Sequence, residues 1–210
     1  MTTDDERWFA MPALAGSKVR LVPLTLEHAP GYLAAAGDAE QRQEVFRWQS
    51  PPGGGLQAPA TVADAERHIT AALAARARGR RLPYAQIDAV TGQFAGTTSF
   101  AEPDPVQRTL WIGYTWLGPR WWRTGINVES KLLMMTFAFE ELGAVRVVWY
   151  TDNRNTRSQL AIERLGATRE GVLRKHRQRA DGSWRDTVLY AMVDDDWPAA
   201  KERLITRLTR

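Results

Sequence analysis

The chain has 210 residues, of which 44% are hydrophobic and 25% are charged, so it is long enough to bury a sizeable core. It contains no cysteine, which excludes disulfides, thiolate metal sites and a cysteine nucleophile, and we expect no metal site. No apolar run reaches the roughly 18–20 residues of a membrane span, and the opening Thr2–Glu6 does not resemble a secretory signal. A cytoplasmic protein that does not use a membrane is therefore the default expectation.

The net charge is +4 and is carried mostly by scattered arginines. A coding bias toward arginine, alanine and glycine explains this charge as readily as attraction to an anionic ligand or to RNA does. Because no Lys/Arg run of the nucleic-acid-binding type is present, the charge does not favour nucleic acid as a partner.

The first half of the chain alternates strand-like and helical stretches. Thr61 and Asp64 form a T-x-x-D start signal, and Thr91-Gly92 is a hairpin turn. The elements predicted there are a polar tail (1–16), a strand at Val19–Leu24, a helix from Thr25 to Ala36, a loop at Pro51–Pro59, a helix from Thr61 to Arg78 and two strands within Pro83–Glu102.

The second half repeats this alternation. The predicted elements are a strand at Thr109–Leu117, a helix bearing the stripe Val128, Leu132, Met135, Phe139 and Leu142, a buried strand at Val145–Tyr150, a helix from Asn155 to Gly166, strands at Ala167–Arg177 and Arg185–Val193, and a last helix (197–210). Strict alternation in Thr109–Leu117 places Trp111, Gly113 and Thr115 on one face and Ile112, Tyr114 and Trp116 on the other. Helices among strands, with an antiparallel hairpin at each end, predict one mixed α/β domain over residues 1–210.

The segment PRWWRTGIN (Pro119–Asn127) joins a strand to a helix start. Helix starts carry partial positive charge and unpaired N–H donors, and they bind phosphates readily. Gly125 allows close backbone approach, Thr124 offers a hydroxyl and Arg123 adds a full charge. A capped helix with tryptophans packed on its first turn is the alternative explanation, and Trp121 and Trp122 fit that role better than a chemical one.

A second group of polar residues follows the buried strand, in TDNRNTRSQLAIERLGA (Thr151–Ala167). Asn155 is a helix cap and Gly166 a helix stop. Ser158 is harder to explain by structure alone, because a serine near the inward-facing stripe of this helix needs a polar partner.

Together these residues resemble the GCN5-related N-acetyltransferases (GNAT), specifically the group containing the RimJ and RimL protein acetyltransferases. The resemblance covers roughly Val19 to Trp197 and is specific in Trp111–Ala138 and Asn155–Arg174. It implies the GNAT fold, a mostly antiparallel twisted sheet of about seven strands flanked by helices. Trp122 and Asn127 depart from the family's R/Q-x-x-G-x-G/A pattern and resemble a T-G-I-N-x-E-x-K branch of it.

The resemblance also implies acetyl-CoA as cosubstrate. Its diphosphate would bind the backbone of Thr124, Gly125, Ile126 and Asn127 with help from Arg123, and its pantetheine arm would run along Trp116 and Leu117. Asn155 and Ser158 complete the expected cofactor-binding set.

The usual GNAT tyrosine acid is replaced by Ile162, so the resemblance transfers the acid role to Ser158. The carboxylate base of RimL-like relatives corresponds to Arg177, and the neighbouring His176 is the base that we expect instead, since its ordinary pKa suits neutral pH. Glu102, Glu129 and Glu170 are the other carboxylate candidates, although Glu129 also fits a purely structural role in its first helical turn.

The favoured function is therefore acetyl transfer to a primary amine, with a protein N-terminus as the first choice of acceptor. A small amine, such as an aminoglycoside-like or aminoacyl compound, is close behind. A CoA-binding regulatory module without turnover and an RNA-binding role stay open, as does a homodimer. The loops Arg47–Pro59 and Arg177–Trp184 are the expected walls of the acceptor site.

Overall fold

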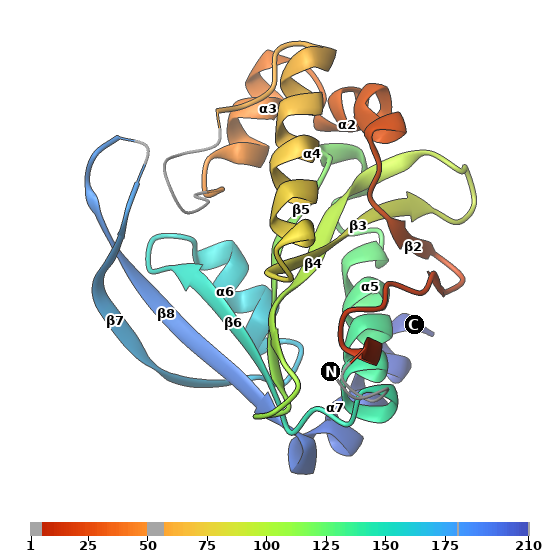
Figure 1. The fold of residues 1–210 in the computed structure, drawn as a ribbon, viewed down its shortest axis with the longest axis vertical. Coiled ribbons are helices and arrows are strands. Elements are labelled where there is room, and N and C mark those ends of the chain that lie inside the picture. Colours follow the sequence, from red (N-terminus) through yellow and green to blue (C-terminus); the bar gives the residue numbers. More distant parts are fainter. Residues whose placement is uncertain (1–5, 50–56, 180, 210) are drawn as a thin grey trace.

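The computed structural model describes residues 6–49, 57–179 and 181–209 and contains one eight-stranded sheet of order β1-β2-β3-β4-β5-β6-β8-β7 (Figure 1). Every neighbouring pair is antiparallel except β5 with β6. The strands are β1 (Leu14–Ala15), β2 (Val19–Pro23), β3 (Arg81–Asp88), β4 (Phe94–Asp104), β5 (Thr109–Leu117), β6 (Arg146–Asp152), β7 (Thr168–Gln178) and β8 (Trp184–Val193). The predicted fold class is confirmed, and the strand beyond the expected seven is the two-residue β1 inside the predicted tail.

Helices cover both faces of this sheet. They are η1 (Leu26–His28), α2 (Ala29–Ala36), α3 (Ala39–Phe46), α4 (Val62–Ala77), η2 (Pro119–Trp121), α5 (Ile126–Thr136), the π-helical η3 (Phe137–Glu141), α6 (Thr156–Glu163), η4 (Asp194–Asp196) and α7 (Trp197–Leu208). Figure 1 shows α2, α3 and α4 grouped at one end of the molecule, while α5 and α7 lie together near the other. Nearly all buried apolar side chains of the described residues form one core cluster.

Ring contacts and hydrogen bonds show which helices cover which face. Lys131 of α5 donates to the hydroxyl of Thr98, whereas Trp116, which lies opposite Thr97, packs against Tyr32 of α2. Because neighbouring residues of a strand point to opposite faces, Thr97 and Thr98 mark two different sides of the sheet. We call the side of Thr98 the α5 face and the side of Thr97 the α2 face.

A β-bulge in β5 overturns the predicted alternation of its side chains. The register with β4 shifts between Thr97 and Ser99, and Tyr114 has a left-handed φ of 50°. The extra residue brings the Tyr114 ring onto that of Trp111, with centroids 5.2 Å apart, and turns Thr115 to the α5 face. A bulge breaks strict alternation, and its left-handed position is occupied by Tyr114, which follows Gly113, so the alternation read from the sequence is wrong beyond that glycine.

The parallel pair opens the sheet. β5 and β6 are in register only at Thr109–Arg146, Leu110–Val147 and Trp111–Val148. Beyond Trp111 the two strands diverge toward their carboxyl ends, as Figure 1 shows. Residues of both strands line a cleft at this divergence.

Several local predictions agree with the structure, and one helix is new. The Thr61/Asp64 capping box starts α4, and Asn155 caps α6 through its side chain. The helix α3 was not predicted, although Asp38 caps it by accepting the Gln41 N–H at 2.9 Å. Residues 51–56 of the predicted loop Pro51–Pro59 lie outside the described residues, and Gln57–Pro59 has no regular secondary structure.

Candidate active site

The start of α5 lies at one end of the cleft. Gly125 is its N-cap residue with a φ of 89°, a conformation that favours glycine, and no side-chain hydrogen bond from the described residues caps this end. The first N–H groups of a helix have no partner within the helix, so they are available to an acceptor outside it. The predicted hydroxyl of Thr124 is not available, because it donates to the Trp121 carbonyl at 2.8 Å.

Glu129 fixes a cation beside this helix start. Its buried carboxylate accepts the N–H groups of Ser17, Lys18 and Val19 at 3.0, 2.6 and 2.8 Å, and so holds the β1–β2 turn against α5. As a result the Lys18 side chain passes close to Gly125, where an added Cβ would lie 3.1 Å from its Cδ. Glu129 therefore has a structural role, and Lys18 is a cation that the sequence did not reveal.

Trp121 and Trp122 hold the segment that leads into α5. The indole N–H of Trp121 donates to Asp88 at 2.8 Å, and that of Trp122 donates to the carbonyl of Leu117 at 2.8 Å. The guanidinium of Arg157, on α6, lies 4.5 Å from the centre of the Trp122 ring. These contacts join the end of β5, the start of α5 and α6.

A cavity of about 960 Å³ extends through the cleft from this helix start, a size typical of small-molecule sites. The predicted cofactor-binding residues that line it are Trp116, Leu117, Arg123, Thr124, Gly125, Asn127, Asn155 and Ser158. The side chain of Ile126, the remaining one, is buried in the core. Lys18 and Arg207 also line the cavity, so its α5 end carries three cationic side chains with Arg123.

Lys131 lines the cavity from α5 and is only 4% exposed. Its ammonium nitrogen donates to the hydroxyls of Thr98 and Thr115 at 2.8 and 3.0 Å, and no described carboxylate forms an ion pair with it. Burial lowers the pKa of Lys131 from 10.5 to about 7. The sequence placed this lysine only in a family pattern and gave no sign that it is buried.

Ser158 lies in the first turn of α6 at the wall of the cavity. Its N–H donates to the Asn155 side-chain oxygen at 3.1 Å, which is the predicted cap. Its hydroxyl has no hydrogen-bond partner among the described residues and is half-buried.

The structure does not bring His176 to the same wall. His176 is exposed on β7, with its ring centre 6.1 Å from that of Tyr150, and it is not among the lining residues. Partial burial lowers its pKa, and the charges of Arg177 and Arg185 lower it further. Two of the carboxylate candidates are also engaged away from the cavity: Glu102 pairs with Arg80 and Glu170 with Arg146.

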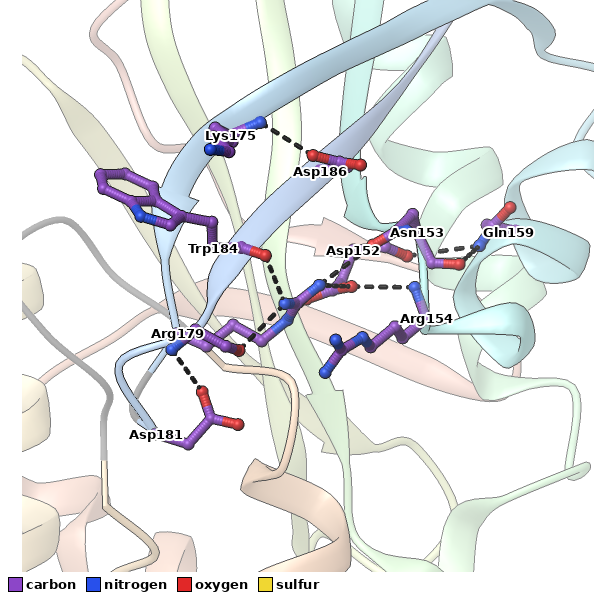
Figure 2. A network of polar contacts seen from close by, with 10 residues as sticks. Asp152, Asn153, Arg154, Gln159, Lys175, Arg179, Asp181, Trp184 and Asp186 are labelled. Atoms are coloured by element: carbon purple, nitrogen blue, oxygen red, sulfur yellow. Dashed lines mark hydrogen bonds and ion pairs between the residues drawn. The ribbon is translucent and has the colours of Figure 1, made fainter.

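The carboxylate that does line the cavity is Asp152, at the end of β6 and 3% exposed. Figure 2 shows its ion pair with Arg179, whose Nε and Nη2 donate to the two carboxylate oxygens at 2.7 and 2.9 Å. The Arg154 N–H adds a bond at 2.8 Å. Burial alone would raise the pKa of Asp152, but the Arg179 guanidinium and the Arg154 amide outweigh it and hold the pKa below its ordinary value.

Arg179 also fastens the tip of the β7–β8 hairpin. Its guanidinium donates to the Trp184 carbonyl at 2.6 Å, to the Ser183 hydroxyl at 3.1 Å and to the Asn153 side chain at 3.0 Å (Figure 2). The sequence pattern predicts a loop over 177–184, but β7 continues to Gln178 and β8 begins at Trp184. A single aspartate after a buried strand has no distinctive pattern, so the sequence did not indicate Asp152.

Solved structures have the same overall fold. A GCN5-related N-acetyltransferase from Brucella melitensis is 30% identical, with a TM-score of 0.86 over 95% of this chain and 86% of that one. RimJ from Mycobacterium smegmatis, solved with CoA-disulfide, has the same fold at 23% identity, with a TM-score of 0.76 over 94% of this chain and 92% of that one. The fold and the cleft therefore define an acetyltransferase class of protein.

Residues 18–168 match the family model described as an acetyltransferase (GNAT) domain, and the chain belongs to the GNAT family. A Bacillus subtilis (strain 168) relative, YdaF, bears the name of a ribosomal N-acetyltransferase and is 31% identical over 110 residues. That region is 52% of this chain and 59% of YdaF, so the chain spans about three fifths of this curated relative.

The predicted family is thereby confirmed, and the name of YdaF supports the predicted RimJ/RimL-like group. Acetyl-CoA is the cosubstrate of this family, as predicted. No helix in the described ranges is long and apolar enough to cross a membrane.

Proposed function

We propose that this protein transfers the acetyl group of acetyl-CoA to a primary amine, and that a protein N-terminus is the preferred acceptor. One observation carries the proposal: a single cavity joins an uncapped helix start surrounded by cations to a free serine hydroxyl and a buried carboxylate. The first half of that arrangement suits a diphosphate, and the second suits proton transfer.

The residues at the α5 start fit the diphosphate of acetyl-CoA. Gly125 keeps the backbone open to close approach, and the N–H groups that follow it are natural donors to phosphate oxygens. Lys18, Arg123 and Arg207 supply the opposite charge around it. When bound, acetyl-CoA supplies a thioester, from which the acetyl group leaves more readily than from an amide.

In the proposed reaction the acceptor nitrogen bonds to the thioester carbonyl carbon and the carbon–sulfur bond breaks. The amine loses a proton and the departing sulfur needs one. We propose Ser158 as the donor to the sulfur, directly or through a water, because its hydroxyl lines the cavity and has no other partner in the described residues.

Two groups are candidates for receiving the proton of the amine. His176 is supported by the ordinary titration range of an imidazole, although its pKa is lowered here, and because it is exposed it needs a water relay from the cavity. Asp152 is supported by its place in the cavity wall, where its negative charge attracts an ammonium. Its lowered pKa makes it a weak base, so we propose that Asp152 orients the amine and that His176 accepts the proton through water.

The acceptor is proposed from the relatives. The name of YdaF points to a ribosomal protein, which favours a protein N-terminus over a small amine. Of the predicted acceptor walls, Trp48, Gln49 and Arg177 line the cavity, whereas Gly53–Gly55 lies outside the described residues.

Thiol release from acetyl-CoA, measured against a panel of N-terminal peptides and small amines, tests this function. We expect amine-dependent release, fastest with peptides, and an acetylated product by mass spectrometry. Thermal stabilisation by CoA without release for any amine would instead indicate a CoA-binding module without turnover. Faster release with a small amine than with every peptide would replace the proposed acceptor.

A further inference from the structure

Arg185, on β8, is a buried cation that pairs with no described residue. Its side chain lines the cavity, and the residue is only 6% exposed. Its guanidinium has no hydrogen bond or ion pair with any described residue, and its Nε is fully enclosed. Burial lowers the pKa of Arg185 to about 10, which leaves it charged at neutral pH. Burying an unpaired charge costs free energy, so an unpaired guanidinium in the wall of a cavity points to an anionic ligand.

The surrounding charges do not neutralise Arg185. Asp152 attracts it, but Arg179 already occupies both oxygens of that carboxylate. Arg177 lies directly opposite Arg185 in the β7–β8 register and also lines the cavity. Asp181 and Asp186 add negative charge near Arg179, but neither lines the cavity. Arg177 and Arg185 therefore share with Arg179 the one carboxylate, Asp152, among the described lining residues.

Strand register shows that this positive charge is not part of the diphosphate site. Trp111 lies on the α2 face, because it pairs with Ala101, which is on the same side of β4 as Thr97. Trp111 also pairs with Val148 on β6, so Tyr150 and Asp152, two and four residues further along β6, lie on this face as well. Asp152 pairs with Thr187, so Arg185, two residues further along β8, points to the same face. Lys131 and Thr115 lie on the α5 face, as does the helix whose start we assign to the diphosphate. The arginines therefore lie on the face of the sheet opposite the helix start assigned to the diphosphate, where the proposed acceptor can reach them.

We propose that the acceptor carries a carboxylate close to its amine and that the Arg185 guanidinium binds this carboxylate. The guanidinium fork matches a carboxylate with two parallel N–H bonds. Amino acids and peptides are the common amines with a nearby anion, and in both the anion is a carboxylate. It is either the α-carboxylate of a free amino acid or the side chain of an acidic residue at a peptide N-terminus. This inference rests on the proposed acetyl transfer and specifies its acceptor.

Two matched pairs of acceptors test the proposal and separate its two sources. One pair is alanine and alaninamide; the other is Glu-Ala-Ala-amide and Gln-Ala-Ala-amide. We expect the wild-type protein to use the carboxylate member of one pair about 10-fold or more better in kcat/KM, as for a hydrogen-bonded charge. A preference within the first pair identifies the α-carboxylate of a free amino acid as the group bound, and a preference within the second pair identifies the acidic side chain of a peptide N-terminus. Equal use of both members in both pairs would overturn the proposal and leave acetyl transfer intact.

Variants attribute the preference to Arg185. We expect Arg185→Gln to bring the kcat/KM ratio of the preferred pair close to 1 and Arg185→Lys to retain part of it. Arg174→Gln, an exposed arginine of β7 outside the cavity lining, should keep the full ratio. A full preference in Arg185→Gln would assign recognition to another group and overturn the proposal.

Binding to the CoA complex gives an answer that needs no turnover. We expect N-acetyl-Glu-Ala-Ala-amide or N-acetylalanine to raise the melting temperature of the wild-type complex more than its neutral counterpart does, and Arg185→Gln to remove that difference. Equal shifts within both pairs would overturn the proposal. Absence of transfer to all four amines, with the difference in melting shift present, would instead count against the proposed reaction alone.

Discussion

The hydroxyl of Ser158 faces the cavity without a partner in the described residues, while the N–H of the same residue is held by the Asn155 cap. One residue thus serves two roles that can be separated by mutation. Removing the hydroxyl leaves the capping bond in place, because the cap uses the backbone.

We predict that Ser158→Ala lowers kcat by roughly 10- to 1000-fold, the range of general acid catalysis, with far less change in acetyl-CoA affinity. Steady-state kinetics together with CoA titration measure both quantities. Thr156→Ala removes another hydroxyl from the same helical turn outside the cavity lining and should keep wild-type turnover. Full turnover in Ser158→Ala would leave the serine with a capping role only.

Residue-scale prediction from the sequence succeeded where a local pattern exists. Asn155 and Gly125 stand at recognisable helix starts, and both line the cavity. Asp152 and Arg185 belong to no short motif, and the T-G-I-N-x-E-x-K pattern that contains Lys131 does not indicate its burial. Their roles come from burial and from partners distant in the chain, such as the bond between Arg179 and Asp152, and a single sequence carries no record of such contacts.

At the scale of elements, the proposed cofactor binding depends on the start of α5. A side chain at Gly125 would need a left-handed φ and would meet the Lys18 side chain, where the proposed ligand also lies. The Lys18 side chain is flexible and can move aside, so the fold tolerates such a change better than the ligand does.

We predict that Gly125→Leu folds but is no longer stabilised by acetyl-CoA. For the parent protein, ligand at ~100 times its dissociation constant adds roughly 2.7 kcal/mol to the free energy of unfolding, a clear rise in melting temperature. Gly92→Leu is the matched control, since Gly92 has a similar φ of 70° but no heavy atom within 4 Å of an added Cβ. A normal shift in Gly125→Leu would move the diphosphate away from this helix start.

The β7–β8 hairpin depends on a different contact, the buried pair of Arg179 and Asp152. Removing one partner of a buried ion pair leaves a charge without compensation. The guanidinium also holds the hairpin tip through Ser183 and Trp184, so its loss affects local order as well as charge.

We predict that Arg179→Met destabilises the fold by about 3 kcal/mol and raises the pKa of Asp152. In the parent protein this pKa is lowered, so its contribution to stability is present above the ordinary aspartate pKa and is lost as the pH falls through the folded-state value. Urea unfolding at pH 7 and pH 4 measures the effect, which should be larger at pH 7. Arg174→Met serves as a control on the same strand, and equal stability of both variants would contradict the prediction.

At the scale of the whole molecule, Lys131 ties stability to pH. Its folded-state pKa of about 7 lies below the ordinary 10.5, so between these values the unfolded chain holds a proton that the folded chain lacks. The free energy of unfolding therefore rises with pH across this window, and the cost of burying the charge is fully present below it.

We predict that Lys131→Met flattens this slope and stabilises the protein most at pH 6. The hydroxyls of Thr98 and Thr115 lie 2.9 Å apart, so they stay bonded to each other when the amine is gone. Unfolding midpoints of the ligand-free protein at pH 6, 7.5 and 9 test this, with the exposed Lys175→Met as control. Parallel slopes for wild type and Lys131→Met would show that the amine stays protonated in the fold.

The overall architecture was more predictable than its irregular parts. Element types and order follow from periodicity and from caps such as the Thr61/Asp64 box, and resemblance to a family supplied their assembly. The bulge at Tyr114 and the helix α3 were missed, because the first is set by pairing with β4 and the second has weak apolar periodicity. Both lie next to the cavity, where function requires departures from regular patterns.

The divergence of β5 from β6 also bears on solubility. Past Trp111, the side of β5 that faces β6 has no strand paired to it. Unpaired strand edges are the usual sites of strand addition and aggregation. Two side chains occupy carbonyl groups of this edge: Gln49 donates to the Thr115 carbonyl at 3.0 Å, and Trp122 donates to the Leu117 carbonyl at 2.8 Å. Residues of β6 and α6 line the opposite side of the cavity, so a strand of another protein molecule would have to displace these contacts to pair with this edge.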